Sequence, residues 1–353
     1  MEEKHLKILA GVFVFLFIVY FVTKPRHTGV NIDEFVQSII IGVSKNDIKT
    51  VEVYKETASE QPVQMVFNHM DGRWVISTHF NAKAQTSHMD RLLDDLLEMT
   101  GNVRSSDPKH FETYNISDEQ GIHLLLKDET NKTLANLIIG KKADDNNMGF
   151  IRFAGKEKVY SIDKNILSDL NIYGDIDTLS QFQQKNFVEL QAVDQNKYDL
   201  EMVGISAQGK EVIIKKVEKE VEFIAEDSSK ATKIETEWVL VKSNREIDLK
   251  QNEVDNFFRD VEKIRAQEVV DHIGNSFQDM NKSSQYGFRR PTHYIMFKKP
   301  ETPQQNVLFG KEYEKDKGYY FNVQYDGLVY KITKSTYDRI FDWIDELPKK
   351  TKN

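Results

Sequence analysis

Residue types that could carry out chemistry occur at several places, but none has the spacing that a reaction requires. His69, His79 and His88 lie near one another in the chain, yet no two of them are spaced as metal ligands on one helix face. Gly204 to Gly209 contains Ser206 but is one residue too long for a loop that presents a nucleophilic serine, so Ser206 is interpreted as a turn residue. We therefore predict a non-enzymatic protein with no catalytic residues, no metal site and no cofactor.

Two further patterns have a simpler structural interpretation. Asp144 to Asn147 offers oxygen ligands for calcium but lacks the alternating spacing and distal glutamate of an EF-hand loop, so it is interpreted as a polar hairpin connection. Gly140 and Gly310 are each followed by a lysine, as in a repeated anion site. A glycine with positive φ at a strand end explains the same residues, and we adopt that interpretation.

Composition excludes several classes of function. The chain has 353 residues, a formal net charge of −8 and no cysteine. A net negative chain without a long internal basic run is a poor partner for nucleic acid, because phosphate binding needs clustered lysine and arginine. Disulfides, thiolate zinc sites and thiol nucleophiles are excluded outright. The length predicts two domains, since single hydrophobic cores stop growing well before it.

The N-terminal segment predicts a membrane anchor. Residues 8–22 contain no charge and are flanked by lysines and an arginine, and no small-residue cleavage site follows them. We therefore expect residues 1–26 to form an uncleaved transmembrane helix. The positive charges on its two sides are nearly balanced, so they do not determine the orientation.

Residues 27–45 are predicted to hold a short juxtamembrane helix and a linker. Phe35, Val36, Ile39 and Ile40 form its apolar stripe, which suits contact with the bilayer surface or with a helix of a partner. Packing of the same stripe on the first domain is the alternative, and the sequence leaves both open.

An internal repeat is the most informative feature of the chain. Each half has a tryptophan strand followed by an amphipathic helix, an apolar strand that ends in Gly-Lys, and a hairpin that ends in Val-Tyr. The glycine and the tyrosine are twenty positions apart in both halves. These equivalent residues are expected to be structural, and they are Trp74, Gly140, Tyr160, Trp238, Gly310 and Tyr330.

The predicted fold class is α+β, with an N-terminal transmembrane helix followed by two tandem repeats of an antiparallel-sheet-plus-helices unit. The first unit is placed at 46–175, the second at 176–348 and a basic tail at 349–353. Residues 218–233 are interpreted as a solvated hairpin extension or loop. The expected helices cover 87–99, 163–170, 251–264 and 335–347.

The order of these motifs resembles the bacterial family catalogued as domain of unknown function 4340. The resemblance rests on the tryptophan strands, on Tyr114-Asn115 and Tyr286-Gly287, and on the hairpins that end in Val-Tyr. It implies an inner-membrane protein that faces the periplasm and is often encoded beside gliding-type ABC transporters. It supplies no catalytic motif.

These observations lead to three hypotheses. The first is a non-enzymatic, membrane-anchored extracytoplasmic scaffold or accessory subunit with a membrane-protein partner such as ABC transporter subunits. The second is a binding module for a small molecule or envelope polymer in a cleft between the units, and the third is an unrecognised hydrolase.

Overall fold

Strands dominate the architecture. The structure, a computed structural model, describes residues 37–56, 63–144, 147–173, 184–224, 230–274 and 280–352. Of these residues, 46% lie in strands and 22% in helices. The expected fold class was therefore wrong: the chain is mostly β-sheet, and its helices are short. The apolar stripes that predicted the helices are present, but the end of the helix predicted at 251–264 belongs to a strand.

None of the helices in the described ranges is long and apolar enough to cross a membrane. The predicted anchor at 1–26 and the residues Phe35 and Val36 lie outside those ranges.

The first unit is a sheet of ten antiparallel strands in the order β1-β6-β10-β9-β8-β7-β2-β3-β4-β5. The strands are β1 Gln37–Ser38, β2 Thr50–Lys55, β3 Val63–Met70, β4 Arg73–Ile76, β5 Ala82–Lys83, β6 Thr100–Ser105, β7 Ile122–Lys127, β8 Thr133–Lys142, β9 Gly149–Phe153 and β10 Val159–Ile162. Its helices are α2 Thr86–Glu98 and α3 Ile166–Asp169.

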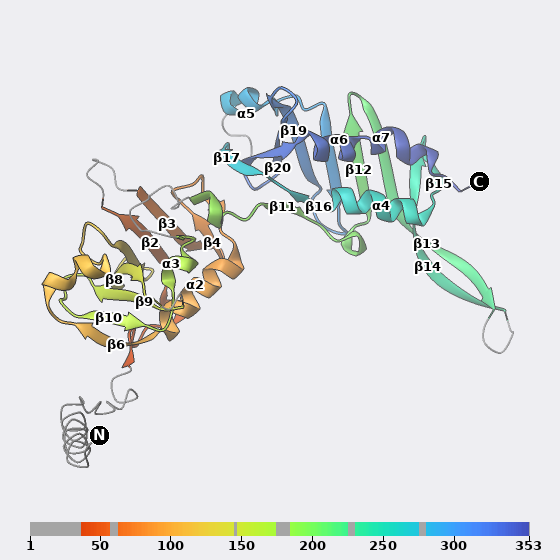
Figure 1. Cartoon of the computed structure of the whole chain (residues 1–353). Coiled ribbons are helices and arrows are strands. Elements are labelled where there is room, and N and C mark those ends of the chain that lie inside the picture. The colour runs from red at the N-terminus through yellow and green to blue at the C-terminus, as the bar shows by residue number, and fades with distance from the viewer. Residues whose placement is uncertain are drawn as a thin grey trace, which may run out of the picture.

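The second unit is a sheet of nine strands in the order β15-β14-β13-β12-β18-β19-β20-β21-β17. The strands are β12 Met202–Ala207, β13 Lys210–Ile224, β14 Lys230–Lys242, β15 Arg245–Asp248, β17 Glu268–His272, β18 His293–Lys298, β19 Gln305–Glu314, β20 Gly318–Val323 and β21 Leu328–Thr333. Its helices are α4 Gln251–Val261, α5 Met280–Tyr286, α6 Lys334–Phe341 and α7 Trp343–Glu346. A separate antiparallel pair is formed by β11 Gln191–Asp194, which precedes the second sheet in the chain, and β16 Lys263–Arg265, which follows α4 (Figure 1).

The two large sheets share one strand order. Starting from β6 in the first unit and β17 in the second, nine consecutive strands correspond one to one. The hairpins correspond in register too, because Leu137 pairs with Phe153 as Val307 pairs with Val323. Positions in one unit can therefore be compared directly with positions in the other.

Each unit buries an amphipathic helix against its sheet. On α2 the buried residues include Leu92, Leu93 and Leu96, and on α4 they are Val254, Phe257, Phe258 and Val261. Trp74 in β4 and Trp238 in β14 are both buried, and Trp238 packs on Phe258 with ring centroids 4.7 Å apart. The burial of such apolar faces is the main stabilising contribution to each unit.

Gly140 and Gly310 are required for a reason that differs from the expected one. Both lie inside strands, β8 and β19, and neither has a positive φ. A Cβ on Gly140 would collide with the backbone oxygen of Tyr114, and one on Gly310 would collide with that of Tyr286. The glycine therefore permits a close approach of a neighbouring loop to the strand.

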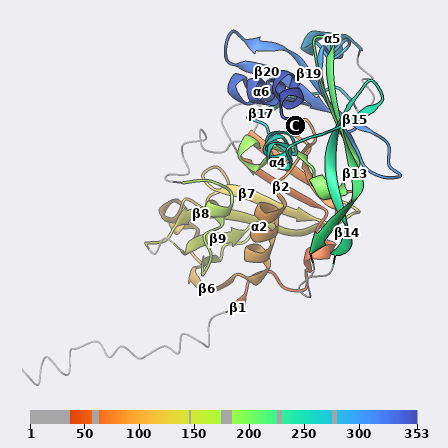
Figure 2. The ribbon, with the colours of Figure 1, turned by 90° about the vertical axis from the view of Figure 1, so that its right-hand side faces the viewer.

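One local prediction was wrong and another was confirmed. Ser206 is not in a turn but is buried in β12, and the turn follows at Gln208 and Gly209, both with positive φ. The interpretation of residues 218–233 as a hairpin extension is confirmed where the structure describes them, because β13 and β14 pair in one unbroken register as far as Ile224 and Lys230. Figure 2 shows these strands as a narrow ribbon that leaves the body of the second unit.

The linker between the units forms backbone hydrogen bonds with both of them. The Gln85 amide donates to the Phe187 carbonyl at 2.8 Å, and the Glu189 amide donates to that of Lys83 at 2.7 Å. On the other side, the Ala266 amide donates to the Leu190 carbonyl at 2.7 Å. The linker is thus hydrogen-bonded through its backbone to the edge of the first sheet and to the second unit.

Candidate docking site

An apolar groove lies on the first unit, where β8, β9 and β10 meet. It encloses about 860 Å³. The rings of Phe153 and Tyr160 stand perpendicular to each other with centroids 6.4 Å apart. The remaining lining residues are Thr133, Leu134, Ala135, Asn136, Ala154, Gly155, Lys156, Glu157 and Lys158.

The hairpin geometry forms one lip of this groove. Strand β8 extends beyond β9, and the last bond between them runs from the Ala154 amide to the Asn136 carbonyl at 3.0 Å. The chain then turns at Gly155, whose φ of 71° favours glycine. The side-chain oxygen Oδ1 of Asn136 is shielded from solvent and has no hydrogen-bond partner within the described residues. A buried acceptor of this kind is costly unless a donor arrives.

Arg152 supports the lip from beneath, and it is only 2% exposed. Its Nη1 donates to the carbonyls of Phe153 and Lys156, at 3.5 and 3.4 Å, and its Nε donates to the Ile116 carbonyl at 2.6 Å. The guanidinium also lies 4.6 Å from the centre of the Phe111 ring. These contacts fix the turn that borders the groove.

The equivalent surface of the second unit is covered. Phe153, Lys158 and Tyr160 correspond in register to Val323, Leu328 and Tyr330. These residues of the second unit are 4%, 3% and 3% exposed, whereas Phe153 and Tyr160 are partly exposed and Lys158 is exposed.

Charges of the first unit and the linker reach the covered surface. The pKa of Asp326 is raised to about 6, chiefly because burial disfavours its ionised form. Hydrogen bonds from the Leu328 amide and the Tyr330 hydroxyl oppose this shift, as do the positive charges of Lys83 and Arg73. The counterpart of the open groove is therefore buried and lies within electrostatic range of the first unit.

The raised pKa of Asp326 predicts a pH dependence of stability. Because its folded-state pKa exceeds the ordinary value near 4, the folded protein holds more protons than the unfolded chain between about pH 4 and 6. The free energy of unfolding should then fall as pH rises through that window. Asp326→Asn should remove a drop on the order of 2 kcal/mol, measured by urea denaturation at pH 4.5 and 7.

Asp194→Asn, which changes an exposed carboxylate, is the matched control and should keep the full pH dependence. Asp169 also has a pKa raised to about 6, by burial and by the nearby charge of Asp95, so a smaller slope of the same sign should persist in Asp326→Asn. An unchanged slope in that variant would contradict the assignment.

Asp169 connects α3 to α2 through polar contacts. Its carboxylate pairs with Arg91 Nε at 3.1 Å, and its backbone oxygen lies 2.6 Å from His88 Nε2. The His88 ring also packs on Phe187 with centroids 4.6 Å apart. Each polar contact of this cluster serves packing between helices and linker.

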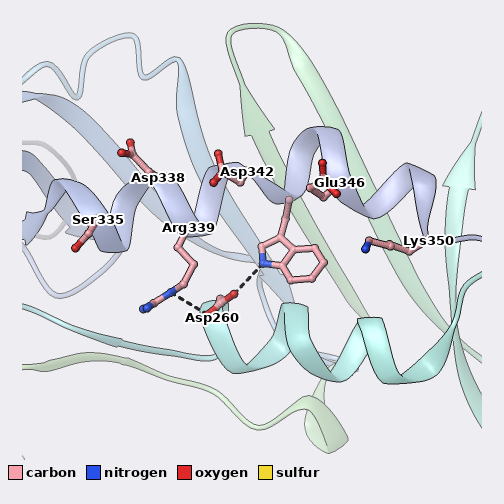
Figure 3. A pocket seen from close by; sticks show the side chains of 8 residues that line it. Asp260, Ser335, Asp338, Arg339, Asp342, Glu346 and Lys350 are labelled. Carbon is pink, nitrogen blue, oxygen red and sulfur yellow. Dashed lines mark hydrogen bonds and ion pairs between the residues drawn. The ribbon is translucent and has the colours of Figure 1, made fainter.

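A second groove, of about 340 Å³, runs between α4 and the pair α6 and α7 (Figure 3). Asp260 lies at its centre, where it accepts a hydrogen bond from Trp343 Nε1 and pairs with Arg339 Nε, both at 2.9 Å. Asp338, Asp342 and Glu346 give the rim a negative charge. Because both oxygens of Asp260 are engaged, this arrangement links α4 to α6 and α7.

The histidines singled out in the sequence do not meet. His69 packs on Trp74, His79 packs on Phe80, and His88 points toward α3. In the described ranges no three histidine, aspartate or glutamate side chains are grouped as metal ligands.

Of the predicted contact residues, Ile39 and Ile40 lie in the described ranges, and neither lines the groove. Ile39 and Ile40 are buried in the core of the first unit, 6% and 7% exposed, and Gln37 and Ser38 form β1 and not a helix. Ile41, the next residue, is 80% exposed. These two isoleucines therefore stabilise the unit instead of facing a partner.

Sequence reasoning did not find the groove. The available signal was a mismatch between the repeats, because Lys158 occupies the position at which the second unit has Leu328. A polar residue in one repeat and an apolar residue at the equivalent position of the other indicate a surface that is exposed in the first repeat and buried in the second.

The comparisons with known proteins are consistent with this architecture. The model of the family described as "Domain of unknown function (DUF4340)" matches residues 74–291, from the tryptophan strand of the first unit to the loop before β18. No curated protein and no solved structure matches the chain. Since the match covers more than half of the sequence and spans both units, the chain belongs to the DUF4340 family.

Proposed function

We propose that the protein is a non-enzymatic interaction module that binds a membrane-protein partner through the groove of its first unit. One observation carries the proposal: this groove is the repeat counterpart of a surface that is buried in the second unit and lies near charges of the first. A surface that is buried in one copy and open in the other is suited to bind a partner.

The chemistry of the groove suits a polypeptide. Phe153 and Tyr160 supply flat apolar area, which is the composition of binding hot spots. The unpartnered Oδ1 of Asn136 would accept a hydrogen bond from a backbone amide. Lys156 and Lys158 at the lip favour an acidic partner segment, whereas in the second unit Asp326 faces the basic Arg73 and Lys83.

The partner and the location come from the family resemblance. It favours an accessory role at the extracytoplasmic face of a bacterial inner membrane, beside subunits of an ABC-type transporter. The place between the units, where a small-molecule cleft was the alternative, holds the buried linker residues Phe187 and Val188.

The test is cross-linking of the tagged full-length protein in mild detergent, followed by mass spectrometry. We expect transporter subunits with the wild-type chain and their loss with Ala154→Glu, which places a charge inside the groove. Lys109→Glu alters an exposed residue outside the groove and should retain them. Equal recovery with Ala154→Glu, or recovery of no membrane protein at all, would overturn the proposal.

A further inference from the structure

The outer part of the β13–β14 hairpin has two open edges. The two strands pair from Ile213 and Val241 to Ile224 and Lys230. Neighbouring strands cover only its base, because β12 pairs with β13 no farther than Lys215 and β15 pairs with β14 only from Val239 to Lys242. In the described part of the chain, no strand pairs with the outer edge of β14 before Val239 (Figures 1 and 2).

The direction of the free backbone groups on β14 follows from Trp238. Its amide donates to Gln251 Oε1 and its carbonyl accepts from Gln251 Nε2, so both groups point away from β13. Backbone direction alternates along a regular strand, and the register here has no bulge. The amides and carbonyls of Thr232, Ile234 and Thr236 therefore point outward, toward the open edge.

This edge is complementary to itself. If a second copy approaches antiparallel with Ile234 opposite its own equivalent, then Thr232 lies opposite Thr236 and Lys233 opposite Glu235. The three outward-facing residues of each chain would exchange both backbone hydrogen bonds, as antiparallel pairing requires. The register also creates two opposite-charge pairs and two threonine pairs, which are favourable cross-strand neighbours.

Side-chain exposure agrees with this geometry. Ile234 is 68% exposed although it lies in a regular strand, and pairing would cover it with the same residue of the other chain. Lys233 Nζ lies 2.6 Å from Glu235 Oε1 within one chain, so the two charges that would pair across the axis are adjacent and on one face.

The other edge of the hairpin lacks this property. If two copies of β13 paired antiparallel with Lys219 opposite its own equivalent, Glu218 would lie opposite Glu220. With Glu220 opposite its own equivalent, Glu218 would lie opposite Glu222. Like charges directly opposite one another destabilise pairing. Charges that oppose self-association therefore protect β13 and leave β14 as the compatible edge.

We propose that β14 is a self-association surface, on which the Thr232–Thr236 segments of two copies join as antiparallel strands about a two-fold axis. Such an interface is isologous, and it closes after two chains. A five-residue strand pair buries less than the ~1,000 Å² expected of a stable interface, so the dimer should form in a concentration-dependent equilibrium.

The test exchanges the charges at Lys233 and Glu235. Association of the full-length protein in detergent is measured by sedimentation over a range of concentrations. Lys233→Glu or Glu235→Lys alone places four like charges at the axis and should weaken association about tenfold or more. The double variant restores opposite charges and should associate like the wild type. An equal mixture of the two single variants should form a mixed dimer, whereas Lys109→Glu should have no effect.

A cross-link supplies an independent readout, because the chain contains no cysteine. Ile234→Cys should give a covalent dimer on treatment with a short bismaleimide, and Tyr198→Cys, at an exposed position in the second unit, should not. A chain that stays monomeric at every concentration would overturn the proposal. The proposal would be overturned in the same way if the edge pairs only with a strand of another protein. Single charge variants that associate as the wild type does would overturn it as well.

Discussion

Replacing Phe187 by alanine is expected to lower the free energy of unfolding by about 3–5 kcal/mol, the usual cost of removing a fully buried aromatic ring. Phe187 is 1% exposed, and its ring contacts Phe67 of the first unit and His88 of α2 with centroids 5.3 and 4.6 Å away. It lies in the linker, whose backbone bonds the first sheet to the second unit. The cavity should therefore destabilise the first unit and weaken its attachment to the second.

Tryptophan fluorescence during denaturation can separate these two effects. Trp74 reports on the first unit, and Trp238 and Trp343 report on the second. In Phe187→Ala we expect the transition to move to lower denaturant and its cooperativity to decrease. Ile41→Ala removes an exposed apolar side chain and should change stability by less than about 0.5 kcal/mol. A similarly small change in Phe187→Ala would show that the linker does not hold the units.

The sequence predicted the features that follow from local periodicity. The buried faces of α2 and α4 lie on the residues that their apolar spacing indicated. The predicted end of α4 was wrong. Ile264 continues the helical spacing of the apolar stripe, but it is buried in β16 and pairs with Val193 of β11. Periodicity cannot distinguish the last turn of a helix from the first buried residue of a following strand.

Other features depend on contacts between distant residues. Gly140 was visible in the sequence, but its reason, the backbone of Tyr114 packed against it, was not. Ile39 and Ile40 formed an apolar stripe that fitted either a partner or the protein's own core. Pairing of Gln37 with Gly101 in β6 places them in the core, and no local pattern contains that register.

The candidate groove depends on a relation between the two repeats. Tyr160 and Tyr330 were correctly matched as equivalent residues, but equivalence of position does not imply equal exposure. Tyr330 is covered by its surroundings at the junction, whereas Tyr160 lines an open groove. A repeated unit in one chain has unequal neighbours, so the copy at the end of the pair retains an unused surface.

Replacing Arg152 by methionine should cost about 3 kcal/mol, because the substitution leaves the buried Ile116 carbonyl without its donor and removes the cation from the Phe111 ring. It should also abolish partner binding, because the Phe153 and Lys156 carbonyls lose the guanidinium that fixes the lip. Urea denaturation measures the first effect, and the cross-linking experiment measures the second. A variant as stable as the wild type would contradict this role.

The second unit provides the matched comparison. Asn322 occupies the position equivalent to Arg152, is 2% exposed, and donates through Nδ2 to the Leu328 carbonyl at 2.8 Å. In both units a buried donor thus holds the hairpin turn, but only the first unit's turn borders an open groove. Asn322→Leu should therefore destabilise the protein by about 1–3 kcal/mol and leave partner recovery unchanged. Loss of the partner in Asn322→Leu, with retention in Arg152→Met, would place the binding surface on the second unit instead.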